Sequence, residues 1–160
     1  MFQQRIKAED SIKDATFGRD LPHARACMAL VTAMIAEVAE ASTAEQARGF
    51  FNAIGARLAA LSPVAEVEDS DQLVERINRL WEAIGWGRVI LEFDDHGLDI
   101  HHRELPLLVD GHDAALWLRA APDILCGAYD TWLHSLGSGD QLSTRVLRTA
   151  GTTITLRHGL

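Results

Sequence analysis

Cysteine is scarce in this chain of 160 residues, which has only Cys27 and Cys126. Two cysteines so far apart form neither a disulfide framework nor a zinc site. Both lie in apolar helical stretches, so we expect them to be buried small hydrophobic residues rather than nucleophiles. Basic residues are also in the minority, 15 against 23 acidic ones, giving a net charge of −8. This balance disfavours nucleic acid as a partner, because binding to phosphate depends mainly on cationic side chains.

Long hydrophobic runs are absent as well. The most apolar stretch, Ala24 to Ala41, contains Arg25, Glu37 and Glu40, so we expect no direct membrane insertion. Residues 1–20 are polar and mixed in charge and lack the pattern of a secretory signal, which favours the cytoplasm. The composition, 48% hydrophobic and 24% charged, is that of a globular protein. We therefore expect a flexible N-terminal segment over residues 1–20 and a single domain over residues 21–160.

Helical periodicity dominates the first half of the chain. It predicts one helix after Pro22, a second after Thr43 and a third after Asp69 or Ser70, which cap it. Thr43 with Gln46 has the form of a capping box. The residues expected to face the core are Met28, Leu30, Val31, Met34, Ile35 and Val38 in the first helix; Ala47, Phe50, Phe51, Ile54, Leu58 and Leu61 in the second; and Leu73, Val74, Ile77, Leu80, Trp81 and Ile84 in the third.

The periodicity changes to two after Gly87. Alternating residues around the turn Asp95-His96-Gly97 predict a β-hairpin, with Val89, Leu91 and Phe93 on one strand and Leu98, Ile100 and His102 on the other. A short helical piece over 113–119 and a helix starting at Pro122 follow, and Gly137 suits the C-terminal cap of that helix. Residues 142–149 and 152–158 predict a second hairpin. The expected fold class is α+β: about three N-terminal helices, a β-hairpin, a helix and a C-terminal β-hairpin, forming a small antiparallel sheet.

Histidines cluster around the first hairpin, at His96, His101, His102 and His112. His101 and His102 are adjacent, so on a strand they point to opposite faces, and we expect no metal site. The chain contains no Gly-x-Ser-x-Gly nucleophile motif, and Gly137-x-Gly139 precedes a strand rather than the start of a helix. We therefore predict a protein that is not an enzyme and has no catalytic residues, cofactor or metal.

Trp86 differs from the other tryptophans because it stands between Gly85 and Gly87, where a helix gives way to a strand. It is expected either to cover the end of the helix or to take part in an interface. Trp81, Trp117 and Trp132 lie on helices beside aliphatic residues, which indicates a packing role.

A resemblance emerges from residues 73–133. Four stretches carry it, namely Ile84-Gly85-Trp86-Gly87-Arg88-Val89-Ile90-Leu91, Ile100-His101-His102-Arg103-Glu104-Leu105-Pro106, Trp117-Leu118 and Gly127-Ala128-Tyr129-Asp130-Thr131-Trp132. They are similar to the patterns W-G-x-V-x-L, I-x-H-x-x-L-P, W-L and G-x-Y-x-x-W of BcsD, the family of cellulose synthase D subunits. The resemblance implies structural or interface roles for Trp86, Gly87, His102, Pro106, Trp117, Tyr129 and Trp132.

The resemblance also implies a function. Members of this family are accessory proteins of bacterial cellulose synthesis that form homo-octameric cylinders built from dimers. They help β-1,4-glucan chains to leave the synthase in aligned arrays. Implied partners are the other cellulose synthase subunits and a proline-rich companion protein of the operon. The expected location is the cytoplasm, in association with the inner-membrane synthase complex, with the periplasm as the alternative.

Residues 1–20 are expected to be mobile in a monomer and to line an interior passage in such a cylinder. Sugar faces favour aromatic stacking and hydrogen bonds from amides and hydroxyls. The residues of the right kind are Phe2, Gln3, Gln4, Ser11 and Phe17. Charged neighbours such as Arg5 and Glu9 are equally typical of a plain solvated tail.

Two other hypotheses remain open. The order of helix, hairpin, helix and hairpin also resembles vinyl-reductase-like and haem-NO-binding-like small-molecule sensor domains. A bound ligand or haem absorbance on purification would favour a sensor, whereas a large symmetric particle without a chromophore would favour the cellulose accessory protein. A glycosidase would require turnover of a β-glucan oligomer.

Overall fold

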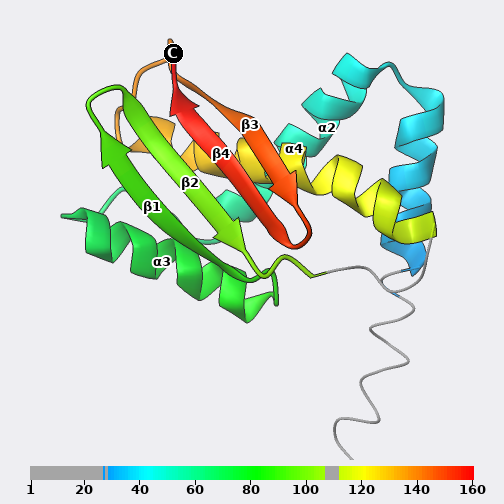
Figure 1. Ribbon diagram of the computed structural model, residues 1–160, viewed down its shortest axis with the longest axis horizontal. Coiled ribbons are helices and arrows are strands. Elements are labelled where there is room, and N and C mark those ends of the chain that lie inside the picture. Colours follow the sequence, from blue (N-terminus) through cyan, green and yellow to red (C-terminus); the bar gives the residue numbers. More distant parts are fainter. Residues whose placement is uncertain (1–26, 28, 107–111) are drawn as a thin grey trace, which may run out of the picture.

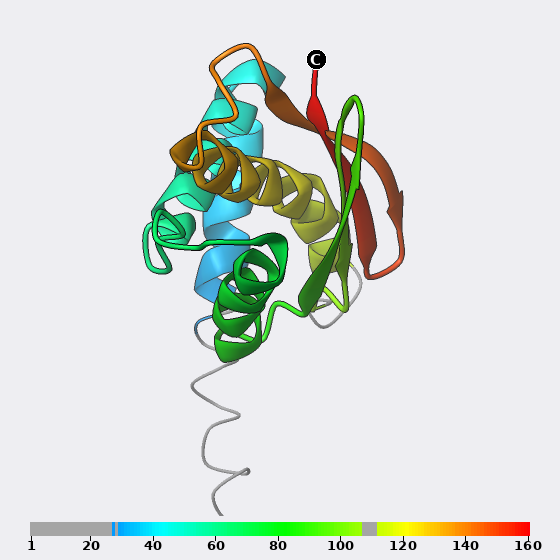
Figure 2. The same ribbon diagram turned by 90° about the vertical axis from the view of Figure 1, so that its left-hand side faces the viewer.

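The computed structural model describes residues 27, 29–106 and 112–160. Four antiparallel strands form one sheet, and helices cover one of its faces, so the molecule has two layers (Figures 1 and 2). The elements are α2 (Ala44–Ala59), α3 (Ser70–Ala83), β1 (Arg88–Asp94), β2 (Gly97–Arg103), α4 (His112–Ser135), β3 (Ser143–Ala150) and β4 (Thr153–Gly159), preceded by helical residues 29–41. The α+β class and the C-terminal hairpin are confirmed.

The sheet has the order β1-β2-β4-β3, with both hairpins antiparallel. Strand β2 pairs with β4 in the centre, where Ile100 lies opposite Leu156 and His102 opposite Ile154. All four of these side chains are buried under the helices, and the period-two pattern predicted the shared face of Ile100 and His102. The sheet therefore presents one face to the core and the other to solvent.

Helix starts agree with the sequence. The Thr43 side chain accepts from the Gln46 backbone N–H at 3.2 Å, and the Gln46 side chain accepts from the Thr43 N–H at 2.9 Å, which completes the capping box. The Asp69 side chain caps α3 by accepting from Gln72 N–H at 2.8 Å. These bonds satisfy backbone N–H groups that would otherwise lack a partner.

The expected break before Pro122 is wrong. Helix α4 runs through Pro122 without interruption, where we expected a short piece and then a new helix. Proline removes one backbone donor, but Ala120, Ala121, Ile124 and Leu125 on both sides of it are buried. Packing on both sides therefore holds the helix together where local propensity predicts its end.

Several residues expected in the core are exposed instead. In α2 the buried residues are Phe51, Gly55 and Ala59, whereas Phe50 is 43% exposed and Leu61, beyond the end of the helix, is 68% exposed. The face of α2 that packs on α4 is the one that carries Gly55 and Ala59, because small residues allow the two helices to approach closely. The other expected core residues that are exposed are Leu30, Val31, Met34 and Ile84, and Cys27, expected to be buried, is exposed as well. Phe93, which alternates with Val89 and Leu91 on β1, is also exposed.

Candidate functional site

Six aromatic side chains from three elements and one connection meet beneath the sheet. They are Trp81 of α3, Trp86 of the α3–β1 connection, His102 of β2, and Trp117, Tyr129 and Trp132 of α4. We call this group the aromatic cluster. Trp81 and Trp86 are stacked, with ring centroids 5.7 Å apart and planes within 8°. The Trp117 ring stands edge-on to Trp86 at 5.0 Å, and Trp132 stands edge-on to Trp81 at 5.4 Å. These are the offset and edge-to-face arrangements that aromatic rings favour.

Hydrogen bonds run through the cluster in one direction. A carbonyl oxygen only accepts, so His102 Nε2–H must donate to the Trp86 carbonyl oxygen, 2.7 Å away. The neutral ring then accepts at Nδ1 from the Tyr129 hydroxyl, at 2.9 Å. The Tyr129 oxygen in turn accepts from Trp81 Nε1–H at 3.2 Å. Each of these buried polar groups is therefore satisfied when His102 is uncharged.

Burial controls the titration of this chain of groups. It lowers the pKa of His102 to about 4, against a smaller opposing effect of the bond to the Trp86 carbonyl. It also raises the pKa of the Tyr129 phenol well above its usual range. Both groups are neutral at physiological pH, and neither is poised to exchange a proton near pH 7.

Two further tryptophan N–H groups tie the cluster to the surrounding backbone. Trp117 Nε1–H donates to the Pro106 carbonyl oxygen at 2.7 Å. Trp132 Nε1–H donates to the carbonyl oxygens of Ala59 and Ser62 at 3.1 and 2.9 Å, which fixes the end of α2. The cluster thus connects α2, α3, α4 and the sheet.

Gly87 allows the strand to start beside the cluster. Its φ is +83°, in the left-handed region that favours glycine. A Cβ atom built on it would lie 2.0 Å from the Arg103 carbonyl oxygen and 2.6 Å from that of Glu104. Only glycine permits this close approach of two backbone segments.

The structure brings together all seven residues that the resemblance singled out, namely Trp86, Gly87, His102, Pro106, Trp117, Tyr129 and Trp132. Their network is internal and mostly buried. Trp81 belongs to the same cluster and was assigned only to packing. The residues named for a glucan passage, Phe2, Gln3, Gln4, Ser11 and Phe17, lie outside the described part of the chain.

The solvent face of the sheet carries a second, charged network. Arg157 of β4 donates two hydrogen bonds to Asp94, both 2.7 Å long, and one of 2.9 Å to Asp99. The Arg157 guanidinium, with the His96 N–H, holds the pKa of Asp94 well below its usual range. His101 faces Glu92 at 3.4 Å on this side, opposite His102, as the strand alternation predicted. Among the described residues, no three His, Cys, Asp or Glu side chains are grouped to hold a metal ion.

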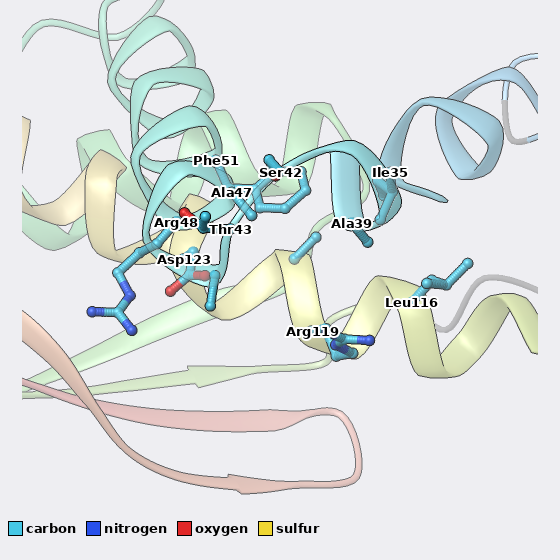
Figure 3. A pocket seen from close by; sticks show the side chains of 12 residues that line it. Ile35, Ala39, Ser42, Thr43, Ala47, Arg48, Phe51, Leu116, Arg119 and Asp123 are labelled. Carbon is cyan, nitrogen blue, oxygen red and sulfur yellow. The ribbon is translucent and has the colours of Figure 1, made fainter. Parts of the chain in front are cut away.

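A cavity of about 310 Å³ lies between helical residues 29–41, α2 and α4. Figure 3 shows Ile35, Phe51 and Leu116 among its apolar lining and Arg48, Arg119 and Asp123 as its charged residues. Burial raises the pKa of Asp123, and the charge of Arg48 opposes this shift. The cavity combines an apolar lining with groups able to bind polar ligands, and the hydroxyls of Ser42 and Thr43 among its described lining residues bond to backbone groups rather than to a base.

Comparison with protein-family models gives a match that covers residues 20–159, to the family described as the D subunit of cellulose synthase. The match supports a role of the chain in cellulose synthesis. The chain belongs to this D-subunit family, as its motif residues indicated. A comparison with curated proteins found no match. In the part of the chain that the structure describes, no helix is long and apolar enough to cross a membrane.

Proposed function

We propose that this protein is a non-catalytic accessory subunit of bacterial cellulose synthase. It forms a ring-like homo-oligomer, an octamer built from dimers, which guides, exports and helps to crystallise nascent β-1,4-glucan chains. The observation that carries the proposal is the family match over residues 20–159. The convergence of the motif residues on one internal cluster supports it, because the family pattern then preserves a scaffold rather than a reaction centre.

Exposed apolar side chains support the assembly. Leu30, Met34 and Phe50 are 63%, 52% and 43% exposed on helical residues 29–41 and on α2. Exposed apolar surface of this kind is typical of contacts between subunits, and closed symmetry covers it without forming filaments. The partners we propose are further copies of the chain, the other synthase subunits and a proline-rich companion protein. The proposed location is the cytoplasmic side of the inner-membrane synthase complex, with the periplasm as the alternative.

The decisive measurement of assembly is light scattering of the full chain. A particle of several subunits is expected, and a stable monomer of 17.6 kDa at micromolar concentration contradicts the ring. Haem or another chromophore bound on purification would favour a sensor instead.

Deletion of residues 2–15 tests whether the N-terminal segment contacts glucan. If the assembly keeps its size and cellulose output falls in a complemented deletion strain, the segment acts on glucan or on export. Unchanged cellulose yield and crystallinity would show that Phe2, Gln3, Gln4 and Ser11 have no such role; Phe17, which this deletion retains, needs its own substitution by alanine.

A further inference from the structure

The two edges of the sheet are protected to different extents. At the β1 edge, the Asn78 side chain of α3 binds both backbone groups of Val89, accepting from its N–H at 2.6 Å and donating to its carbonyl oxygen at 3.1 Å. At the β3 edge, the cap is a single bond from Thr144 N–H to Asp130 Oδ1, 2.6 Å long. An uncovered edge strand offers unpaired N–H and C=O groups to any extended chain that approaches it.

Beyond Thr144, strand β3 is open. Residues 145–150 are all exposed, including Val146 at 37% and Leu147 at 54%. Because Thr144 N–H points away from β4, the alternation of strand bonding turns the backbone groups of Val146 outward as well. The register shifts between Val146 and Arg148, which limits the regular edge to the first half of β3.

A groove lies beside this open stretch. It has a volume of about 390 Å³ and is lined by residues of α2, α4 and β3, among them Asn52, Cys126, Thr144 and Val146. Cys126 and Thr144 are buried. The Asn52 side-chain oxygen is buried there and has no donor among the described residues. Leaving a buried acceptor without a hydrogen bond costs free energy. A ligand in the groove that donates a hydrogen bond to the Asn52 oxygen would therefore gain binding free energy.

Three arginines lie at or next to the groove although the whole chain carries −8, and the carboxylates of Asp123 and Asp130 lie beside it as well. Arg48 and Arg145 line it, and Arg148 follows on the same strand. None of these three guanidinium groups makes an ion pair with the acidic side chain of another described residue. Asp123 also lines the groove and interacts with the charge of Arg48, and Arg145 donates to the main-chain oxygen of Leu160. Arg148 is therefore the arginine most available to attract an acidic ligand, and Arg145 is the next.

We propose that the edge of β3 binds an extended acidic segment of a partner protein as an additional strand. The segment would exchange backbone hydrogen bonds with Val146. It would place alternate side chains in the groove, where one donates to Asn52, and direct its carboxylates toward Arg145 and Arg148. This is recognition by strand addition, in which the backbone supplies affinity and the side chains supply specificity. A second copy of β3 fits less well, because self-pairing about Val146 gathers Arg145 and Arg148 of both copies along one edge, where like charges repel.

The test uses the full chain and a fluorescent peptide of alternating valine and glutamate, followed by anisotropy. Saturable binding is expected. A matched valine–lysine peptide should bind at least roughly tenfold more weakly, because like charges then face the arginines. N-methylation of the peptide residues that face β3 should abolish binding, whereas N-methylation of the alternate residues should leave it intact. Hydrogen exchange should show protection of the Val146 amide on binding.

Variants locate the site. Arg148→Glu and Asn52→Leu should each weaken binding several-fold, while Arg79→Glu, an exposed change on α3, should not. Thermal unfolding of each variant shows whether it is folded. The proposal is wrong if no peptide binds, if the lysine peptide binds equally well, or if neither pattern of N-methylation matters. It is also wrong if the wild type binds no peptide and Arg148→Glu forms a larger oligomer than the wild type. Removing the repulsion between arginines would then have allowed β3 of a second copy to pair with this edge. These outcomes do not depend on the proposed role in cellulose synthesis.

Discussion

His102 on β2 donates a 2.7 Å hydrogen bond to the carbonyl oxygen of Trp86, which precedes β1. The bond joins the two motifs that first indicated the family, because Trp86 belongs to one and His102 to the other. Through Tyr129 the same ring is tied to α4. The motif residues therefore hold the helical layer on the sheet, and their first measurable effect should be on stability rather than on a reaction.

The stability of the protein should depend on pH through His102. Its pKa is about 4 in the folded state, against about 6.5 for an unperturbed histidine. Between these values the unfolded chain binds a proton that the native protein does not, so the free energy of unfolding falls as the pH is lowered from about 6.5 to 4. The full effect is up to about 3 kcal/mol. Chemical denaturation across this range measures it.

A variant is needed to assign this dependence, because the pKa of His158 is lowered by burial as well. His102→Gln should flatten the slope of stability against pH, since its side chain does not titrate. His96→Gln, at an exposed turn, should leave the slope unchanged. Equal slopes in the wild type and in His102→Gln would show that His102 does not control it.

Trp86→Ala should destabilise the protein by about 2–4 kcal/mol, in line with other truncations of packed aromatic residues. The change removes the stacking on Trp81 and the edge contact with Trp117 but keeps the carbonyl oxygen that His102 needs. Trp86→Phe should recover part of the loss. Urea denaturation measures both changes. A folded alanine variant with unchanged unfolding and unchanged particle size would mean that Trp86 contributes neither to the cluster nor to an interface.

Two glycines that flank Trp86 should respond differently to alanine. Both have a positive φ, +71° at Gly85 and +83° at Gly87. At Gly85 an added Cβ meets no atom of the described residues within 4 Å, so the cost should be the backbone strain, about 1 kcal/mol. At Gly87 it meets two backbone carbonyl oxygens, so the alanine variant should lose several kcal/mol or fail to fold. Thermal unfolding of the pair measures the difference, and similar losses would contradict the close approach.

Local patterns predicted the elements that depend on local physics. The capping box at Thr43 and the alternation of Leu98, Ile100 and His102 needed only spacing and residue type, and both are found. Predictions from local patterns failed where packing against residues distant in the sequence determines the structure. The continuity of α4 through Pro122 depends on the burial of its flanks, and the exposure of Phe50 depends on how closely α2 approaches α4.

Local sequence patterns could not predict the contacts within the candidate site. Trp81 and Tyr129 are 48 residues apart, and His102 and Tyr129 are 27 apart. Helical or strand periodicity does not relate positions so far apart. Most residues of the site were therefore identified only through the family resemblance. The edge caps by Asn78 and Asp130 were missed for the same reason, because an ordinary helical Asn or Asp carries no signal that it will bind a strand.

The contact between α2 and α4 gives the last prediction, a pair of substitutions of opposite sign on one helix. Gly55 of α2 lies so close to α4 that an added Cβ would be 1.9 Å from the Ile124 carbonyl oxygen and 2.7 Å from the Ala128 nitrogen. Gly127 approaches α2 in the same way, with an added Cβ 2.0 Å from the Asn52 carbonyl oxygen. Backbone atoms on both sides cannot yield, so Gly55→Ala should force the helices apart and cost several kcal/mol.

Gly49 is the matched control. It lies on the same helix, is exposed, and has open space around its Cβ position. Alanine is the better helix former by roughly 0.5–1 kcal/mol, so Gly49→Ala should raise the melting temperature while Gly55→Ala lowers it. Circular dichroism during heating measures both, and light scattering shows whether the particle survives. If Gly55→Ala melts at or above the wild-type temperature, the close packing of α2 on α4 through Gly55 is wrong. A loss in Gly49→Ala would instead show that this face is covered in the assembled protein, because, apart from its neighbours in α2, none of the residues that the structure describes lies within 4 Å of the added methyl group.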